Sequence, residues 1–288
     1  MSSLIVYRPL TATPLKRNIS YSELTPCKEL HPYIRCYWGT ESPMIRSEND
    51  ATMELVIPDT CVDIIYDIDY TNNTVSGGFC GINDCSFHTD NNETIGHMIS
   101  TFAIRFYGWG AYAFADDSMK STLNGYFDVG SRFEWLDKII RPQLLELKTL
   151  QEKVSFVEKL LIKRLPNVKE NIIVNDTIRN ILLHRGSLDV SSLAKDSFVS
   201  TRQLERLFQE YVGITPKKLS NLIRYQFLWR DILFKPDFDV LSAVHKYGYT
   251  DQSHLLREFK RYHSLDIHSA KSIAFENVGN IQDIYAEL

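Results

Sequence analysis

The chain has 288 residues, of which 44% are apolar and 24% charged, and its formal net charge is −4. These values are typical of a globular protein with room for two domains, and they exclude a fibrous or largely disordered chain. No apolar run approaches the ~20 residues that span a bilayer, and Met1 is not followed by a basic stretch ahead of an apolar one, so we expect a cytoplasmic protein.

Charge and cysteine are unevenly distributed. Residues 187–275 hold 13 Lys and Arg against 10 Asp and Glu, a charge of +3, whereas residues 1–186 sum to −4 and residues 276–288 to −3. Because phosphate affinity depends on where the cations lie, the acidic total does not exclude nucleic-acid binding but predicts modest non-specific affinity. The five cysteines all precede residue 90, and an odd number argues against a secreted disulfide framework.

The first half of the chain favours strands. Residues 1–33 contain four prolines and favour extended or turn structure. Beyond them, short β-rich runs occur at 34–39, 53–57, 62–68, 75–80 and 99–106. Turn signals separate them at Pro58-Asp59, Asn72-Asn73, Gly77-Gly78 and Asp90 to Asn92. Many short strands at such spacing predict a small antiparallel barrel or sandwich.

Between residues 144 and 165 apolar residues recur at helical spacing, which predicts a helix of about six turns. Its apolar stripe can serve as domain core or as a dimer seam. Pro166-Asn167 ends the pattern, and residues 171–184 are expected to form the first helix of a second domain. The domain boundary is therefore predicted near 165–172.

One pattern occurs twice between residues 188 and 263. Leu204-Glu-Arg206-Leu-Phe208 and Leu255-Leu-Arg257-Glu-Phe259 share the order Leu-x-Arg-x-Phe. In a helix this spacing places Leu and Phe on the core face and Arg outward. Each motif follows a short amphipathic segment and a turn, at 190–200 and at 240–250. Two short helices joined by a tight turn make a helix-turn-helix, so the sequence predicts two such units.

A stiff connector is predicted between the two units. Pro216 can open a helix, and residues 217–233 contain neither Gly nor Pro until Pro236. About 18 residues at ~1.5 Å each give a rod of roughly 27 Å. This is near the ~34 Å between successive major grooves on one face of a duplex.

These residues resemble a known family. The stretches STRQLERLFQEYVGITPKKLSNLIRYQ and GYTDQSHLLREFKRY are similar to the DNA-binding domain of AraC-type transcription regulators, over roughly residues 185–270. The runs from Val56 to Tyr66 and from Ala103 to Phe114 resemble an uncharacterised domain found ahead of such modules. In the wider family, such N-terminal domains sense a small molecule, mediate dimerisation, or both.

The resemblance implies which side chains meet DNA. Base edges are expected to be read by outward residues of the two second helices, with fewer contacts from the second one: Arg202, Glu205, Arg206, Gln252, Ser253, His254 and Arg257. Arg can pair bidentately with guanine. Phosphate contacts are expected from Ser200, Thr201, Lys217, Lys218, Ser253 and Lys260. The alternatives are a solvated charged face and, for His254, packing beside Tyr249.

The second unit departs from the family pattern in two places. Val244 stands where Ala is usual at the helix crossing, and Ser264-Leu-Asp-Ile267 replaces the Gly-x-Thr-Pro ending that the first unit keeps as Gly213 to Pro216. A larger side chain at a crossing costs ~1 to 3 kcal/mol if unrelieved. We therefore expect the second unit to dock on DNA differently or weakly.

The sequence gives weaker support to other kinds of functional site. Cys80, Cys85, His88 and His97 do not have the spacing of a usual zinc site, so we expect no metal, and no phosphate loop or nucleophile elbow predicts a cofactor or an enzyme. A small-ligand pocket could be lined by Asp59, Asp63, Tyr66, Arg105, Trp109 and Tyr112. The alternative is that both aspartates end turns or strands and that Arg105 pairs with one of them.

The sequence thus predicts an α+β chain: a β-rich, barrel- or sandwich-like domain (1–167), an all-α DNA-binding domain with two helix-turn-helix units (168–275), and a tail (276–288). The predicted function is sequence-specific transcription regulation on double-stranded DNA, controlled by a small-molecule effector or by homodimerisation, with RNA polymerase as a partner if it activates. Activation and repression are not distinguished. The alternative is a ligand-binding or catalytic N-terminal domain with a degenerate helical protein-interaction module.

Overall fold

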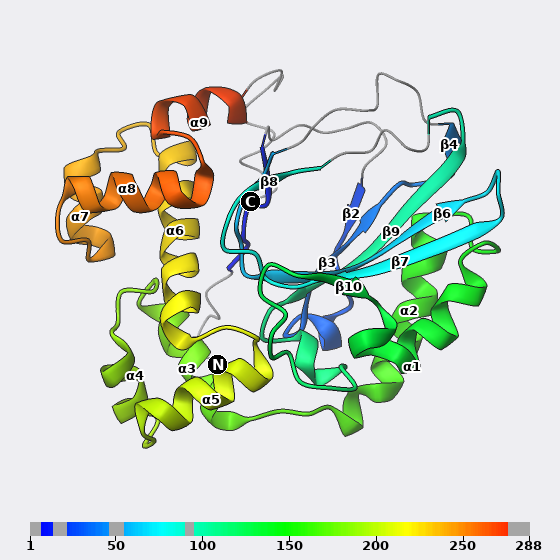
Figure 1. The fold of residues 1–288 in the computed structure, drawn as a ribbon, viewed down its shortest axis with the longest axis horizontal. Coiled ribbons are helices and arrows are strands. Elements are labelled where there is room, and N and C mark those ends of the chain that lie inside the picture. Colours follow the sequence, from blue (N-terminus) through cyan, green and yellow to red (C-terminus); the bar gives the residue numbers. More distant parts are fainter. Residues whose placement is uncertain (1–6, 14–21, 46–54, 90–94, 276–288) are drawn as a thin grey trace.

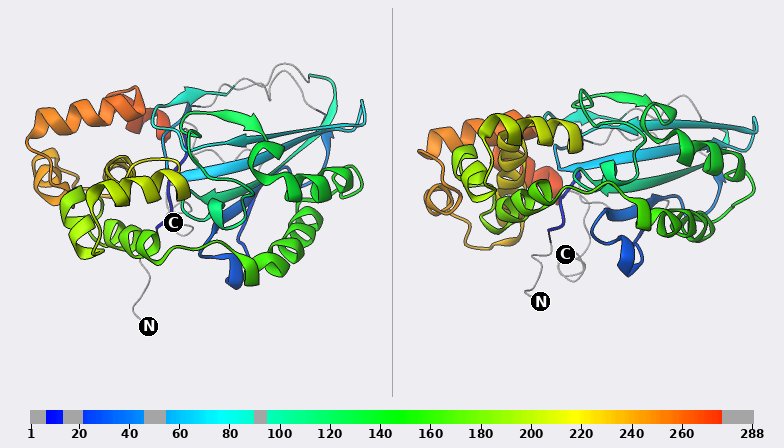
Figure 2. Two further views of the ribbon diagram at one scale, coloured as in Figure 1. Left: turned by 60° about the horizontal axis from the view of Figure 1, so that its bottom comes forward. Right: turned by 90° about the horizontal axis from the view of Figure 1, so that it is seen from below.

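The chain divides into a β-rich part and a helical part. The computed structural model describes residues 7–13, 22–45, 55–89 and 95–275. All described strands precede residue 129, and the helices from residue 172 onward form a separate group beside the sheet (Figure 1 and Figure 2). Figure 1 shows the long helix α6 (Pro216–Phe234) between the sheet and the outer helices. The expected α+β class is confirmed.

Two antiparallel sheets make up the β-rich part. The main sheet runs in the order β10-β7-β6-β9-β3-β2, and β4 also pairs with β9. Its strands are β2 (Ser22–Leu24), β3 (Ile34–Gly39), β4 (Met44–Ile45), β6 (Cys61–Asp69), β7 (Thr74–Cys80), β9 (Met98–Tyr107) and β10 (Tyr126–Asp128). The smaller sheet joins β1 (Ala12–Thr13), β5 (Leu55–Val56) and β8 (Phe87–His88). Within the described residues neither sheet closes into a barrel.

Alternating apolar residues explain how the main sheet is buried. Val62, Ile64, Tyr66 and Ile68 of β6 are at most 1% exposed, as expected when every second side chain faces the core. One helix, α1 (Gly130–Ile140), packs through Phe133, whose ring stacks on Phe106 at 6.0 Å and meets Phe79 edge-on at 5.3 Å.

The strand predictions agree with the structure, with one correction. The five predicted runs correspond to β3, β5, β6, β7 and β9, although residues 53–54 and the turn signal at 90–92 lie outside the described residues. Gly77 and Gly78, which were expected to form a turn, lie inside β7. A Cβ atom would lie 2.9 Å from the Tyr66 ring at Gly77 and 1.9 Å from the Tyr126 hydroxyl at Gly78. The glycines therefore admit neighbouring aromatic rings.

The helix predicted over 144–165 is shorter than expected. Helix α2 spans Leu150–Arg164 because Thr149 caps it: its hydroxyl accepts from the Glu152 amide, and the Glu152 carboxylate accepts from the Thr149 amide. This capping box fixes the first turn at residue 150. Its apolar stripe is buried within the chain, as expected of domain core, at Leu150, Val154, Val157 and Leu161.

Seven helices build the described part of the chain from residue 172 to 275. They are α3 (Ile172–Leu183), α4 (Val190–Asp196), α5 (Thr201–Tyr211), α6 (Pro216–Phe234), α7 (Val240–Tyr247), α8 (Gln252–His263) and α9 (Ile267–Ala274). The sequence did not predict α9. Among the described residues no helix has both the length and the apolar character needed to cross a membrane.

Candidate nucleic-acid interface

The first helix pair, α4 and α5, is joined by a tight turn. The Val199 amide donates to the Ala194 carbonyl at 3.0 Å, and Phe198 at the turn adopts a φ of 54°. The Ser200 hydroxyl then caps α5 by accepting from the Gln203 amide at 3.2 Å. These local bonds set the angle at which α5 leaves the turn.

The second helix pair, α7 and α8, repeats this geometry. The Tyr249 amide donates to the Val244 carbonyl at 3.0 Å, and Gly248 takes the left-handed φ of 66°. Asp251 caps α8 by accepting from the His254 amide at 2.7 Å. The crossing residue Val244 is buried yet supplies the same turn bond as Ala194. The turn therefore closes in the same way despite the larger side chain.

The endings of α5 and α8 are also alike, despite their different sequences. Gly213 has a φ of 82° and Ser264, at the matching position, a φ of 63°. Thr215 caps α6 through a bond from the Lys218 amide at 3.2 Å, and Asp266 caps α9 through a bond from the Ser269 amide at 2.9 Å. Ser264-Leu-Asp-Ile267 therefore makes the same turn as the Gly-x-Thr-Pro ending of the first pair.

Helix α6 connects the two pairs as one rod. Its 19 residues correspond to about 28 Å. Arg224 of α6 donates to both carboxylate oxygens of Glu258 on α8, at 2.7 and 2.9 Å, and lies over the Tyr249 ring at 4.3 Å. The two charged side chains are only 7% and 9% exposed. This buried ion pair fixes α8 against α6.

The outward faces of α5 and α8 carry most of the predicted base-reading residues. Six of the seven are exposed: Arg202, Glu205, Arg206, Gln252, Ser253 and Arg257. His254 instead lies edge-on to the Tyr249 ring at 5.4 Å, and its Nδ1 accepts a long 3.5 Å bond from the Thr250 amide. It thus takes part in packing the turn, which was the alternative expectation for this residue.

The predicted phosphate residues divide into two groups. Thr201, Lys217, Ser253 and Lys260 are exposed, and Ser200 uses one lone pair as a helix cap, which leaves its O–H free to donate. Lys218 differs, because its ammonium is ion-paired with Asp84 of the β-rich part. Burial raises the pKa of the Asp84 carboxyl, but the hydrogen bonds from Lys218 and Asn124, together with the nearby positive charges, outweigh burial and lower this pKa. Lys218 is therefore engaged within the chain, and its phosphate contact stays a prediction.

The sequence did not predict two features of the helical part. Leu256, which was not singled out, is a 44% exposed leucine on α8. When the two motifs are aligned by their helix caps, Ser200 with Asp251, Leu256 falls at the position that matches Glu205. The Arg224–Glu258 pair had no comparable signal, because 34 residues separate its partners.

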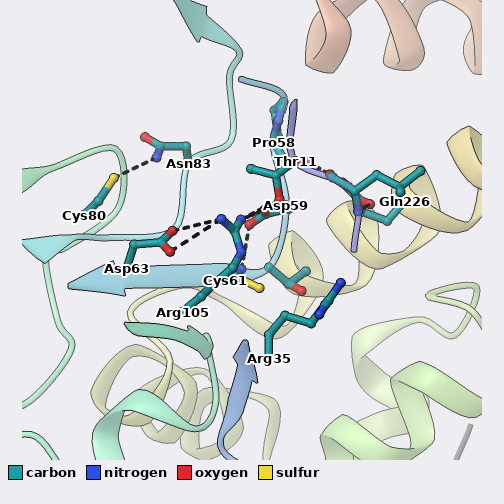
Figure 3. Close-up of polar contacts among 12 residues, drawn as sticks. Thr11, Arg35, Pro58, Asp59, Cys61, Asp63, Cys80, Asn83, Arg105 and Gln226 are labelled. Atoms are coloured by element: carbon teal, nitrogen blue, oxygen red, sulfur yellow. Dashed lines mark hydrogen bonds and ion pairs between the residues drawn. The ribbon is translucent and has the colours of Figure 1, made fainter. Parts of the chain in front are cut away.

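The predicted ligand-pocket residues come together only in part. Figure 3 shows Arg105 between Asp59 and Asp63, with its guanidinium paired to both carboxylates. Burial raises the pKa of Asp63, and the charge of Arg105 opposes that rise. The Tyr66 hydroxyl donates to Asp137, Trp109 stacks on Tyr107, and Tyr112 meets Tyr211. The pairing alternative holds for Arg105, and the six residues do not line one pocket.

The four residues considered for zinc are not gathered. His97 pairs with Asp69, and Cys80 accepts from Asn83, as Figure 3 shows. Among the residues that the structure describes, no cluster of three or more His, Cys, Asp and Glu side chains could hold a metal ion.

Gln226 of α6 anchors the helical part to the β-rich part. Its side-chain oxygen accepts from the Leu10 amide at 2.8 Å, and its amide donates to the carbonyls of Leu10 and Pro58 at 2.8 and 2.7 Å. The side chain is only 3% exposed, so all three bonds are shielded from water. Pro58 precedes Asp59, and Figure 3 shows the Gln226 contact beside the Arg105 cluster.

Comparison with protein families assigns both parts of the chain. Residues 193–267 match a family model described as a helix-turn-helix domain, and residues 22–128 match a domain of unknown function, DUF6597. The C-terminal part is therefore an AraC-type helix-turn-helix domain, the DNA-binding module of a family of transcription regulators. None of the curated proteins compared with the chain matches it.

Solved structures similar to the chain include AraC-type regulators. One from Chromobacterium violaceum is 18% identical, with a TM-score of 0.34, over 37% of this chain and 95% of its own. The DNA-binding domain of AdpA, solved with a target DNA, is 18% identical, with a TM-score of 0.34, over 38% and 97%. ToxT of Vibrio cholerae, solved with an unsaturated fatty acid, is 8% identical, with a TM-score of 0.39, over 92% and 99%.

Proposed function

We propose that this chain is a sequence-specific DNA-binding transcription regulator whose two helix pairs act as helix-turn-helix units on successive major grooves. One observation carries the proposal. The pairs share their turn bonds, helix caps and left-handed closing residues, and each exposes an arginine at the same position, Arg206 and Arg257. Neither arginine has an ion-pair partner among the described residues, so both guanidiniums are available to a ligand.

The chemistry of these faces suits a base edge. Arg206 would pair bidentately with guanine O6 and N7, and Arg257 would do the same in the next groove. The exposed lysines and the hydroxyls near the helix starts would hold the backbone phosphates and set the register. Lys218 would join them only after release from Asp84.

The rigidity of α6 supports simultaneous docking. A rod of about 28 Å can place two helices near the ~34 Å groove repeat. The Arg224–Glu258 pair restricts rotation of α8 about α6, so the second helix does not have to be ordered when DNA binds. Pre-organisation of this kind lowers the entropic cost of association.

We further propose that the β-rich part controls which arrangement of the helical part is populated, as a domain that responds to an effector or to a second copy of the chain. Its contacts support this role, because Asp84 holds Lys218 and the Leu10 and Pro58 backbone holds Gln226. A ligand acts through such contacts if it binds the two arrangements with different affinity.

Selection of DNA fragments from a random pool by the full-length protein tests the main proposal. We expect an enriched sequence with two half-sites about one helical turn apart, and an affinity that falls steeply with salt. A mobility-shift titration of the selected duplex at two salt concentrations measures both properties. Binding without sequence enrichment, or no binding at low salt, contradicts the proposal.

A further inference from the structure

The exposed face of α8 carries one large apolar side chain among polar neighbours. Leu256 is 44% exposed, and Gln252, Ser253, Arg257 and Lys260, which lie beside it or one turn away, are exposed as well. A single exposed leucine is common on protein surfaces. Its meaning therefore depends on where the fold places it.

The repeat places Leu256 at a position that matches Glu205, one of the predicted base-reading residues of α5. Counted from the helix caps Ser200 and Asp251, Glu205 and Leu256 are both the fifth residue. The preceding residues, Leu204 and Leu255, are both fully buried. This shared anchor gives the two helices the same rotation relative to their pairs, so Leu256 projects from α8 as Glu205 projects from α5.

The side chain has no hydrogen-bonding group, which restricts what it can recognise. In the major groove the bases present donors, acceptors and one apolar feature, the C5-methyl group of thymine. A leucine packed against a polar base edge would displace the water bound to the base without replacing its hydrogen bonds. Against a methyl group it loses nothing and removes apolar surface from water on both sides.

We propose that Leu256 is a specificity-determining residue that contacts the methyl group of a thymine in the half-site read by α8. The proposal rests on the function proposed above. It deepens that function, because α5 and α8 then read different bases: where α5 presents Arg202 and Glu205, α8 presents Ser253 and Leu256. The two half-sites are consequently related but not identical.

Replacing thymine by deoxyuridine removes only the methyl group and tests this contact. The probe is the duplex selected by the full-length protein, with each thymine replaced in turn by deoxyuridine, and dissociation constants are measured at one salt concentration. We expect one replacement, in one half-site, to raise the dissociation constant of the wild-type protein about fourfold. This factor corresponds to the free energy of burying one methyl group. Leu256→Ala should bind the unmodified duplex more weakly and be insensitive to that replacement.

Two control variants separate this contact from general effects. Leu241→Ala removes another exposed leucine of the second helix pair, 52% exposed on α7, and should retain the deoxyuridine sensitivity. Arg206→Ala should also retain it, because α5 reads the other half-site. Thermal unfolding of Leu256→Ala should match that of the wild type, since the side chain is not part of the core.

The possible outcomes separate this inference from the function beneath it. The role assigned to Leu256 is wrong if the protein selects a sequence but no deoxyuridine replacement weakens its binding. It is also wrong if binding by Leu256→Ala remains sensitive to the replacement. In both cases sequence-specific binding stands. If no sequence is enriched, both proposals fail together. Loss of the methyl effect in Leu256→Ala alone supports the contact.

Discussion

At the scale of single residues, the two kinds of cation on the helical part should behave differently. Arg206→Ala should cost ~1 to 3 kcal/mol of binding and relax preference at one base position, because a bidentate contact to guanine is lost. Lys217→Ala should weaken binding to all DNA sequences alike and reduce the dependence of the affinity on salt. Mobility shifts on a panel of single-base variants distinguish the two. Wild-type discrimination by Arg206→Ala would refute the assignment of this residue to a base.

His263 should make stability depend on pH. Its ring is fully buried beside Tyr225, Trp229 and Phe259, with Nδ1 at 2.8 Å from the Tyr225 hydroxyl, and burial lowers its pKa from 6.5 to about 4. Since the unfolded chain takes up the proton first, stability is retained above pH 6.5 and falls as the pH drops toward 4. The loss from this group should reach about 3 kcal/mol.

Urea unfolding of the wild type and of His263→Gln between pH 4 and 7 measures this contribution. The variant does not titrate in this range, so its stability should change less with pH even if it is lower throughout. His245→Gln, at an exposed position on α7, is the matched control and should keep the wild-type dependence. Parallel curves for His263→Gln and the wild type would show that this histidine is not responsible.

At the scale of elements, the glycine in the turn between α7 and α8 and the glycine that follows α5 should tolerate substitution differently. Gly248 and Gly213 both have left-handed φ angles, of 66° and 82°. A Cβ on Gly248 meets only Ser187 Cβ at 3.6 Å, whereas one on Gly213 would lie 2.6 Å from the Met119 carbonyl oxygen. Gly248→Ala should therefore cost about 1 to 2 kcal/mol from backbone strain alone, and Gly213→Ala should cost more.

Equilibrium unfolding of the two alanine variants tests that ranking. The clash at Gly213 is with the backbone of the β-rich part, so Gly213→Ala should also weaken the contact between the two parts, including the bond from the Met119 amide to the Glu210 carbonyl, 2.8 Å long. Hydrogen exchange at Met119 should rise in Gly213→Ala and stay unchanged in Gly248→Ala. Equal destabilisation by the two substitutions would contradict this description of the two glycines.

At the scale of the whole molecule, Gln226 should hold the two parts together. Gln226→Leu keeps the approximate size of the side chain but leaves the backbone groups of Leu10 and Pro58 without their partner. Each unsatisfied buried group costs about 1 to 3 kcal/mol. We therefore expect lower stability and faster hydrogen exchange at Leu10, with little change inside α7 and α8.

Gln203→Leu is the control for that experiment, because Gln203 is exposed on α5. Its substitution should change neither stability nor exchange at Leu10. If the Leu10 amide exchanges as slowly in Gln226→Leu as in the wild type, the bonds from α6 are not what protects it.

Local features of the sequence determined most of the helical part. Caps such as Ser200 and Asp251, glycines such as Gly248 and the Leu-x-Arg-x-Phe spacing act within one or two helical turns, so the pattern predicts the helices, their turns and the outward arginines. The five main strands were predicted equally well, because apolar and polar residues alternate along a strand that buries one face. Helix α9 was missed because Ser264 and Asp266 do not carry the expected Gly-x-Thr-Pro signature, although they adopt the same geometry.

Tertiary structure alone decided which distant groups meet. Lys218 pairs with Asp84 across 134 residues of sequence and Gln226 bonds to Leu10 across 216, and no local spacing encodes such partners. The same holds for Tyr66, Trp109 and Tyr112, whose nearness in sequence to Asp59 and Arg105 did not bring them to one pocket. Sequence fixes the conformation of short segments through neighbouring side chains and backbone bonds, whereas long-range contacts depend on how the completed elements pack.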